Sequence, residues 1–300
     1  MHIVRYLDHN DEQVRVGVRT ETGVTPVDVP SLGALLALPL ADIRPAVDAP
    51  AAEPVPLERV TLLPPADGRM EVWASGVTYE RSRAARKEES TQASVYDLVY
   101  DAERPELFLK AVPWRLVTDG EPIAVRRDSR LDVPEPELAV VVNAFGEIVG
   151  YTVCDDVSSR DLEGDNPLYL PQAKIYAGSC SLATGIRPAW QVADAHDLAI
   201  GVEIRRGAEA VWSAETSTAT MRRRLPELVE WLFAETHFPE GVVLSTGTGL
   251  VPEMTVTLLA GDVVAIEIAE VGTLSNPVVE GKDEMSWLLD TDPSTREKVR

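Results

Sequence analysis

The chain has 300 residues, a formal net charge of −21, an apolar fraction of 45% and a charged fraction of 26%, values typical of a globular protein with one or two domains. The negative charge disfavours nucleic acid and anionic membranes as partners, and no apolar run approaches the ~18 residues of a membrane span. Because the first residues lack a signal pattern and the two cysteines lack metal spacing, we expect a soluble cytoplasmic protein.

The first 66 residues are predicted to form a small domain. Ser31 is suited to cap a helix over Leu32–Leu38. Prolines concentrate between residues 50 and 65, which is linker composition and places a domain boundary near residue 66, with a second domain over 67–300. Before the helix, apolar runs predict three short strands, the last an edge strand because it contains proline: His2–Tyr6, Gln13–Arg19 and Val24–Val29.

A highly charged segment follows the first strand of the second domain. Met70–Ala74 is predicted to be that strand, and Glu80–Glu89 is predicted to be a helix. A solvated surface helix is the simple interpretation of its mixed charges. Alternatively, arginines such as Arg81 and Arg83 close over an anionic substrate, as the side chains of lids do.

The next part of the chain predicts a β-hairpin with acids near its open end. Residues 138–142 and 148–154 are apolar runs rich in branched side chains, and residues 143–146 supply turn chemistry. Because strand side chains alternate between faces, Glu135 and Glu137 point the same way. Asp156 falls close to Glu135, across the ladder or one diagonal step away. Three carboxylates therefore share one small region.

Carboxylates that are this close repel one another unless a proton or a cation lies between them. A divalent cation is the simplest answer, and ligation by carboxylates alone selects hard ions such as Mg²⁺, Mn²⁺ or Ca²⁺ over zinc. The alternative is an exposed strand end with solvated acids, which an acidic chain produces often. The spacing leaves both interpretations open.

Two other charged residues stand out less. Glu106 comes directly before the apolar run Leu107–Leu109, an unusual place for an acid unless it faces a site or the surface. Lys174, taken alone, is typical of a solvated lysine. The four histidines lie far from any serine or cysteine elbow and there is no Gly-x-Ser-x-Gly motif, so nucleophilic catalysis is disfavoured.

The remainder of the chain is dominated by strands. Pro226–His237 has the clearest helical periodicity. Residues 242–249 predict a strand that runs into a Gly/Thr loop, without the lysine of a P-loop. Strands and helices do not alternate, so the fold class is α+β, mostly β, and not doubly wound. Ile200–Arg205 and Ala210–Ser213 are predicted to be a further pair of strands, and the fold is completed by the segments Met254–Leu259, Asp262–Ile268 and Thr273–Pro277.

Several of these motifs together resemble the fumarylacetoacetate hydrolase family, in order and with the expected spacing, over about residues 70–280. They are Glu135-x-Glu137, Gly150–Asp161, Lys174, Thr246-Gly-Thr248 and Gly272–Val278. Residues 100–106, 134–137 and 166–178 are similar to the sugar-acid branch of that family. The resemblance implies a mixed β-sandwich roll with a small N-terminal domain, a homo-oligomer (dimer or tetramer), and Mg²⁺ held by Glu135, Glu137 and Asp156.

One departure bears on the reaction. Hydrolytic members usually carry a histidine three residues after the tyrosine of the first loop, whereas here Ser82 follows Tyr79 at that spacing. The resemblance therefore implies a lyase: dehydration of a 2-keto-3-deoxy sugar acid in pentose catabolism, such as 2-keto-3-deoxy-D-arabinonate to 2,5-dioxopentanoate and water. The alternatives are an acylpyruvate-type hydrolase, decarboxylase or isomerase of the same family, or a non-catalytic protein with a structural ion.

The resemblance also implies roles for individual residues. Glu106 is the expected acid or base, and Lys174 the group that hydrogen-bonds the substrate oxygens. Thr273, expected in a loop after a strand, anchors the substrate carboxylate. The remaining residues expected to contact substrate are Ser75, Tyr79, Arg81 and Arg83.

Overall fold

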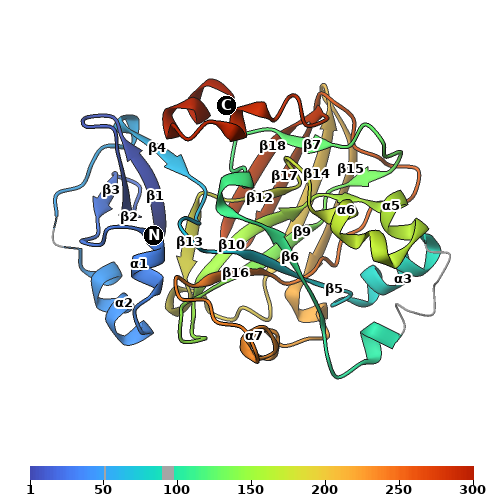
Figure 1. Ribbon diagram of the computed structural model, residues 1–300, viewed down its shortest axis with the longest axis horizontal. Coiled ribbons are helices and arrows are strands. Elements are labelled where there is room, and N and C mark those ends of the chain that lie inside the picture. The colour runs from blue at the N-terminus through green and yellow to red at the C-terminus, as the bar shows by residue number, and fades with distance from the viewer. Residues whose placement is uncertain (51, 90–97) are drawn as a thin grey trace.

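The computed structural model describes residues 1–50, 52–89 and 98–300 of the chain. Within these ranges most strands belong to two sheets, one of eleven strands and one of five. The helices lie around the sheets and do not alternate with the strands (Figure 1). The fold is therefore α+β and mostly β, as predicted. Among the described helices, none has the length and apolar character that crossing a membrane requires.

The N-terminal residues form a three-stranded meander with two helices beside it. Strands β1 (His2–Asp8), β2 (Gln13–Arg19) and β3 (Val24–Pro26) confirm the prediction, with β3 at the edge. Helix α1 (Leu32–Leu36) begins where predicted, and the Ser31 Oγ accepts a hydrogen bond from the Ala34 backbone at 3.0 Å. Helix α2 (Leu40–Asp48) was not predicted, because Pro45 lies inside it.

The proline-rich stretch is more ordered than its linker composition suggests. Its last part contains β4 (Val60–Leu63), which pairs antiparallel with β1. Prolines are tolerated around this short strand because they flank it and take none of its ladder positions. The domain boundary near residue 66 stays a prediction.

The larger sheet joins the N-terminal strands to the rest of the molecule. Its order is β3-β2-β1-β13-β10-β9-β16-β5-β6, with β4 on β1 and β12 on β10. Ile3 in β1 pairs with Ile186 in β13, so the ladder runs on from the meander into the roll. The strands beyond the meander are β5 (Val72–Gly76), β6 (Glu106–Ala111), β9 (Pro136–Val142), β10 (Ile148–Asp156), β12 (Cys180–Leu182), β13 (Gly185–Pro188) and β16 (Val242–Ser245).

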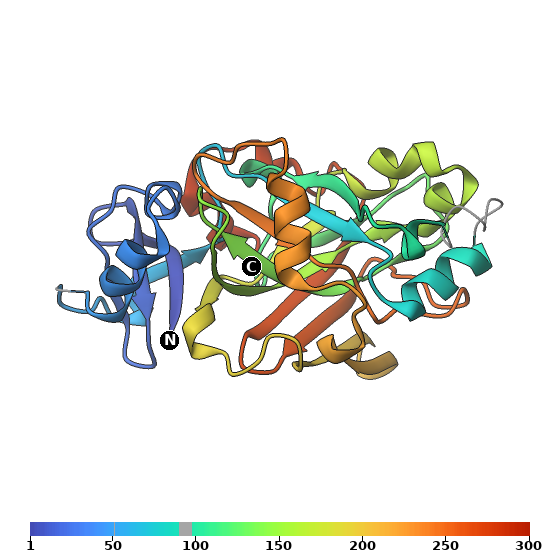
Figure 2. The same cartoon turned by 90° about the horizontal axis from the view of Figure 1, so that it is seen from below.

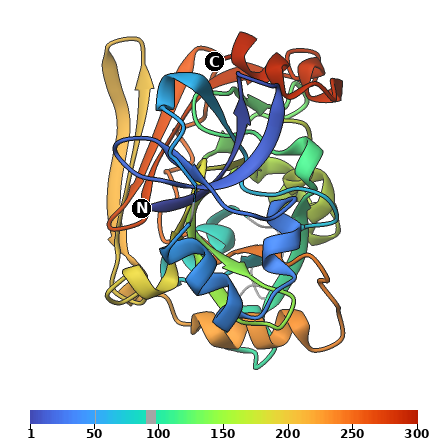
Figure 3. The ribbon, with the colours of Figure 1, turned by 90° about the vertical axis from the view of Figure 1, so that its left-hand side faces the viewer.

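The second sheet has the order β15-β14-β17-β18-β7. Figure 3 shows the long β14–β15 hairpin along one side of the molecule. A separate short ladder joins β8 (Asp132–Val133) to β11 (Ser158–Ser159). The strands of the second sheet are β7 (Ile123–Val125), β14 (Ala199–Arg206), β15 (Glu209–Ser217), β17 (Asp262–Ile268) and β18 (Gly272–Glu280).

One apolar segment of the strand-dominated C-terminal part is not a strand. Residues 254–259 form turns and extended loop. Val256 and Leu258 still pack on the core, so their alternation reflects burial of a loop that has no ladder partner. The Leu258 backbone instead donates a hydrogen bond to the Asp132 carbonyl at 2.8 Å.

Three helices gather at the end opposite the N-terminal strands (Figure 2). They are α3 (Glu80–Glu89), which has its predicted bounds, α5 (Arg160–Asp165) and α6 (Leu170–Lys174). Helix α7 (Leu225–Phe233) ends four residues earlier than predicted and buries Leu228, Val229 and Leu232.

The two sheets pack face to face, and strand alternation decides which side chains they share. On β9, Leu138, Val140 and Val142 point into the core between the sheets, while Ala139 and Val141 point to the other side. On β10, Val153 pairs with Leu138 and Cys154 pairs with Glu137. The acids of the hairpin therefore emerge on the face turned away from the five-stranded sheet.

Candidate metal centre and active site

The structure brings Glu135, Glu137 and Asp156 together at the open end of the β9–β10 hairpin. Each offers a carboxylate oxygen, and these oxygens lie within 4.8 Å of one another. The Asp156 backbone donates to the Glu135 carbonyl at 3.0 Å, so these two residues stand opposite each other, as predicted. All three are almost fully buried, with relative exposures of 3%, 1% and 1%, which excludes a solvated strand end.

The last residue of β16 and the Gly/Thr loop after it hold Glu137. One oxygen, Oε2, accepts hydrogen bonds from the Ser245 hydroxyl at 2.6 Å and the Gly247 backbone at 2.7 Å. Gly247 has a φ of +91°, and a Cβ there would lie 2.0 Å from the Thr78 hydroxyl. Glycine is therefore required for the backbone to approach this carboxylate.

Two buried cations hold the other two carboxylates. The Arg160 Nη1 lies 2.9 Å from Oε1 of Glu135, and the Lys110 Nζ lies 2.5 Å from Oδ1 of Asp156. Arg160 follows β11 directly at the start of α5, and Lys110 comes from β6. Each acid of the triad is thus fixed through one oxygen by a group from a different segment.

Lys174, at the end of α6, lies beside the remaining oxygens. Its Nζ is 2.7 Å from Oε2 of Glu135 and 3.2 Å from Oδ2 of Asp156, and it donates to the Ser158 hydroxyl at 2.5 Å. The side chain is buried, so Lys174 is not the solvated lysine that its sequence context suggests. Its ammonium adds positive charge at the centre of the carboxylate group.

Burial and mutual repulsion change the protonation of this site. Burial, with the charges of Asp156 and Glu135, raises the pKa of Glu137 to about 8. Burial also raises the pKa of Asp155, the neighbour of Asp156, to about 7. At neutral pH a proton therefore occupies a position that a cation could take. A buried set of carboxylates alone fits a hard divalent ion.

Glu106 begins β6 and pairs with Gly76 of β5. A Cβ at Gly76 would lie 1.9 Å from Oε2 of Glu106, so the carboxyl group covers this glycine. Phe108 shares the face of Glu106 because strand side chains alternate, and the Phe108 ring centre is 5.8 Å from the Lys174 Nζ. Glu106 therefore lies on the face that borders the triad, roughly 13 Å along the strand from Lys110.

Ser75 and Tyr79 are both buried, and the Ser75 backbone lies beside Gly247, which donates to Glu137. Burial and then the charge of Glu137 raise the pKa of the Tyr79 hydroxyl well above its ordinary value. Among the described residues, neither the Ser75 Oγ nor the Tyr79 hydroxyl has a hydrogen-bond partner. Buried polar groups left in this way are suited to a ligand.

The two arginines of the predicted lid lie at the start of α3. Arg81 donates to the Val251 carbonyl at 3.3 Å, and Arg83 stacks on the Tyr100 ring at 4.6 Å. Ser82, which stands where hydrolytic members have histidine, is buried and its hydroxyl donates to the Tyr79 carbonyl at 2.7 Å. Ser82 therefore acts as a local cap.

Thr273 is not where the sequence suggested. It lies inside β18 opposite Glu267, not in a loop, and it is exposed. Its neighbour Leu274 faces the core between the sheets, so Thr273 points outward, and it lines a cavity with Met1 and His2. Within one chain the structure does not bring Thr273 to the triad, and its role as a carboxylate anchor stays a prediction.

The structure also shows contacts at the triad from residues that were not among the predicted site residues. Ser158, Arg160, Ser245, Gly247 and Lys110 contact the triad or Lys174. A lysine at the end of the apolar strand 107–111 is the one feature of the sequence that pointed to Lys110, since charged residues are rarely buried unless paired.

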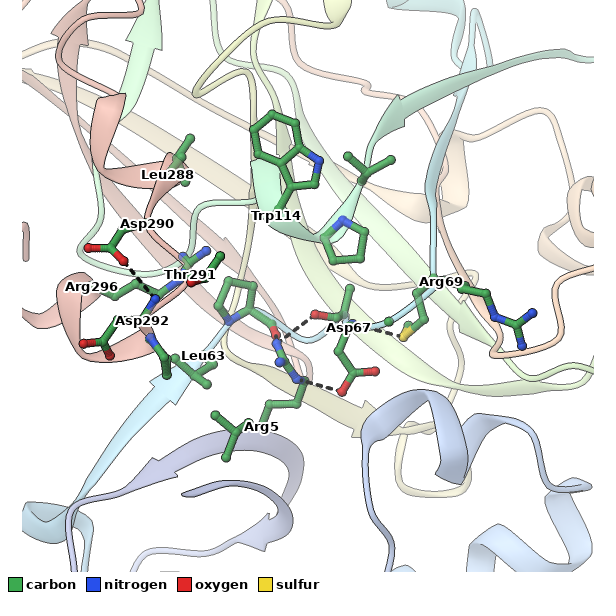
Figure 4. Close-up of a pocket in the computed structure, with 18 of the residues that line it drawn as sticks. Arg5, Leu63, Asp67, Arg69, Trp114, Leu288, Asp290, Thr291, Asp292 and Arg296 are labelled. Carbon is green, nitrogen blue, oxygen red and sulfur yellow. Dashed lines mark hydrogen bonds and ion pairs between the residues drawn. The ribbon is translucent and has the colours of Figure 1, made fainter. Parts of the chain in front are cut away.

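A different cavity, of about 1060 Å³, lies where the N-terminal strands meet the C-terminal segment (Figure 4). Arg5 and Asp67 in its wall form an ion pair at 3.0 Å, and Arg69 pairs with Glu240 at 2.7 Å. The triad does not line this cavity, so we assign the chemistry to the end of the hairpin.

Known proteins share much of this sequence. Residues 71–279 match the family model described as fumarylacetoacetate (FAA) hydrolase C-terminal. A probable 2-keto-3-deoxyxylonate dehydratase of Haloferax volcanii is 50% identical over 208 residues, which span 69% of this chain and 72% of that protein. A 2-dehydro-3-deoxy-D-arabinonate dehydratase of Saccharolobus solfataricus is 45% identical over 212 residues, which span 69% of this chain and 71% of that protein.

A solved structure extends the similarity to nearly the whole chain. It is a 2-keto-3-deoxy-D-arabinonate dehydratase in complex with magnesium and 2,5-dioxopentanoate, with a TM-score of 0.80, 33% sequence identity, and coverage of 94% of this chain and 99% of that one. The shared sheet architecture and the matched family model lead to one conclusion: the chain belongs to the fumarylacetoacetate hydrolase family.

Proposed function

We propose that this protein is a magnesium-dependent dehydratase that converts 2-keto-3-deoxy-D-arabinonate, or a closely related 2-keto-3-deoxy sugar acid, to 2,5-dioxopentanoate and water. The observation that carries the proposal is the buried triad with Lys174 against it. The names of the two relatives and the ligands of the solved structure supply the substrate class.

Glu135, Glu137 and Asp156 would hold Mg²⁺. A bound Mg²⁺ supplies a Lewis acid that polarises the keto group and makes the C3 protons more acidic. Lys110, Arg160 and Lys174 balance the three carboxylates. A divalent ion therefore leaves this centre with net positive charge, which attracts a 2-keto acid anion.

The protein groups around the triad would do the proton chemistry. Lys174 places its ammonium where negative charge develops on the substrate oxygens. Glu106, on the bordering face of β6, would take the proton from C3 and give it to the hydroxyl that leaves as water. Loss of the C3 proton and the C4 hydroxyl leaves a C3=C4 double bond. Removal of a C5 proton and return of a proton to C3 would move this double bond to C4=C5, and the enol formed in this way tautomerises to the aldehyde of the product.

Positioning of the sugar-acid chain falls to the residues before and at the start of α3. Ser75 and Tyr79 offer buried hydroxyls that can bind substrate oxygens, and Tyr79 is close enough to Glu137 to feel its charge. Arg81 and Arg83 would bring positive charge from α3 over the bound anion.

The role of Ser82 separates dehydration from hydrolysis. Its hydroxyl is engaged with the Tyr79 carbonyl, and serine cannot activate water as a histidine base does. This supports a lyase over an acylpyruvate-type hydrolase.

The proposal includes a homo-oligomer, a dimer or a tetramer, in the cytoplasm. Exposed large apolar side chains such as Leu168 (83%), Leu289 (73%) and Trp114 (52%) support association. Cys154 and Cys180 are both free and buried, which suits a reducing compartment. Light scattering coupled to size exclusion measures the assembly directly.

The testing experiment follows turnover of 2-keto-3-deoxy-D-arabinonate with and without EDTA, beside an acylpyruvate. We expect 2,5-dioxopentanoate from the sugar acid alone, abolished by EDTA and restored by Mg²⁺. Cleavage of the acylpyruvate would overturn the lyase assignment. A melting temperature that responds to Mg²⁺ without turnover of either compound would favour a structural ion.

A further inference from the structure

Lys110 is a second buried lysine at the triad, and its surroundings differ from those of Lys174. Its Nζ lies 2.5 Å from Oδ1 of Asp156, 2.6 Å from the Lys174 carbonyl and 3.1 Å from the Val157 carbonyl. An ammonium has three N–H groups, and these three acceptors match that number. Lys110 therefore has no N–H group left to donate to a substrate. Because it is only 1% exposed, a substrate also cannot reach it.

The three acceptors belong to the two segments that carry the chemistry. Asp156 and Val157 lie at the end of β10 and directly after it, and Lys174 ends α6. Lys110 itself comes from β6, so one ammonium links the segment with a predicted metal ligand to the segment with the catalytic lysine. Ser179 reinforces this contact, because its hydroxyl also donates to the Lys174 carbonyl at 2.9 Å.

Lys110 and Lys174 contact the two oxygens of one carboxylate, that of Asp156. Lys110 occupies Oδ1 of Asp156, and Lys174 lies at Oδ2 of the same carboxylate. Fixing one oxygen sets the direction of the other, and fixing the carbonyl of residue 174 sets the origin of its side chain. Groups that orient ligands in this way affect metal affinity or activity by about 10–100-fold when they are removed.

We propose that Lys110 is a positioning residue that sets the geometry between Asp156 and Lys174, so that the ligand and the catalytic ammonium address one substrate together. The inference rests on the proposed function for its kinetic part. Its structural part concerns only how Asp156 binds an ion.

The test compares Lys110→Met with a matched control, Asn143→Ala. Asn143 is fully buried in the turn at the far end of the same hairpin, where its amide donates to the Leu38 carbonyl at 3.0 Å and to Glu147 at 2.7 Å. It lies six residues from Glu137 along the strand, roughly 20 Å away. Both variants lose buried hydrogen bonds, so both should melt earlier than the wild type.

Two readouts separate positioning from stability. Eu³⁺ bound at the triad reports its coordinated waters through luminescence lifetimes in H₂O and D₂O. In Lys110→Met we expect about one more water than in wild type, because Asp156 is no longer aimed at the ion. With saturating Mg²⁺ we expect kcat to fall about 10–100-fold with little change in KM, whereas Asn143→Ala keeps both kcat and the water count.

An unchanged water count together with a kcat within about twofold of wild type would overturn the proposal and leave Lys110 a structural residue only. If Lys110→Met does not fold, Lys110→Gln, which keeps a donor but loses the charge, undergoes the same two measurements. If the wild-type protein turns over no sugar acid, the proposed function fails, while the Eu³⁺ measurement still decides the role of Lys110.

Discussion

The carboxyl group of Glu137 couples metal binding to protons. Its pKa of about 8 means that the folded protein holds this proton at pH 7. A metal ion must displace it, so we expect release of about one proton per ion at pH 7 and an apparent affinity that rises with pH until about pH 8. Titration calorimetry of metal binding in two buffers with different ionisation enthalpies measures the number of protons released per ion. Equal heats in both buffers would contradict the prediction.

Glu106 should affect turnover without affecting the ion. In Glu106→Gln the group can no longer accept the C3 proton, so we expect turnover to fall by at least about 10²-fold. Metal affinity should stay, because Glu106 lies on β6 beside Gly76 and is not one of the triad. The control is Glu267→Gln, an exposed carboxyl on β17. Full activity of the Glu106 variant would remove this residue from the mechanism.

What the sequence predicts about single residues depends on how local their contacts are. Glu135, Glu137 and Asp156 meet across one hairpin, so strand alternation and a turn are enough to group them. Lys110 meets Asp156 only because β6 and the end of β10 come together in the folded roll. Nothing in the spacing of residues 110 and 156 specifies that contact, and the role of Lys174 likewise came from family resemblance.

At the scale of elements, the loop after β16 is the least replaceable part of the site. Gly247→Ala would force a Cβ against the Thr78 hydroxyl and the Ser75 carbonyl, 2.0 Å and 2.9 Å away, besides the strain of a φ of +91°. We expect this loop to shift and release Glu137, with a loss of stability of about 2–4 kcal/mol and a weaker metal site.

The matched control for that loop is Gly261→Ala. Gly261 has a similar φ of +93°, but a Cβ added there would meet no atom within 4 Å. Strain alone should cost about 1 kcal/mol there and leave metal affinity unchanged. Calorimetric metal titration and chemical unfolding of both variants decide the matter: equal effects would mean that the close approach to Thr78 is unimportant.

Elements were predicted well where the pattern and the turn chemistry were local. The β9–β10 hairpin, α3 and the Ser31 cap of α1 all follow from short stretches of sequence. Residues 254–259 mislead because a loop packed on the core shows the same alternation as a strand. Helix α2 was missed because proline in a helix interior is normally a breaker.

At the scale of the whole molecule, the C-terminal segment ties the N-terminal strands to the roll through Glu121. This fully buried acid pairs with Arg296 at 2.7 Å and Arg300 at 2.9 Å, and Arg300 also donates to the Leu62 carbonyl of β4 at 2.6 Å. In Glu121→Gln the arginines lose their counter-charge. We expect stability to fall by about 2–3 kcal/mol, below the full value for a buried pair because both arginines reach solvent.

Thermal unfolding followed by circular dichroism measures this loss, which should lower the melting temperature by roughly 4–10 °C and leave kcat unchanged. Asp128→Asn serves as the comparison, because it breaks the exposed Arg126 pair and should cost less than about 1 kcal/mol. A Glu121 variant as stable as that one would mean that the C-terminal segment does not hold the two parts together.

The overall arrangement was predictable only through resemblance. Composition and periodicity give a mostly β fold, but they do not state which strands pair. The order β3-β2-β1-β13-β10 places the first strand beside one near residue 186, a contact with no local signature. The sandwich roll was predicted from the family motifs alone, because members of one family share a topology even where the pairing of distant strands leaves no local pattern in the sequence.

The pairing of β1 with β13 also has a consequence during synthesis of the chain. Ile3 cannot pair until Ile186 has been made, about 180 residues later. A ribosome that adds roughly 5–20 residues per second needs about 10–40 s for that length. Until then the Ile3–Val4 half of the β1 edge has no partner, although β4 already covers the other half. This edge of the N-terminal meander therefore stays open during synthesis, and rapid overproduction should lose protein to aggregation through it.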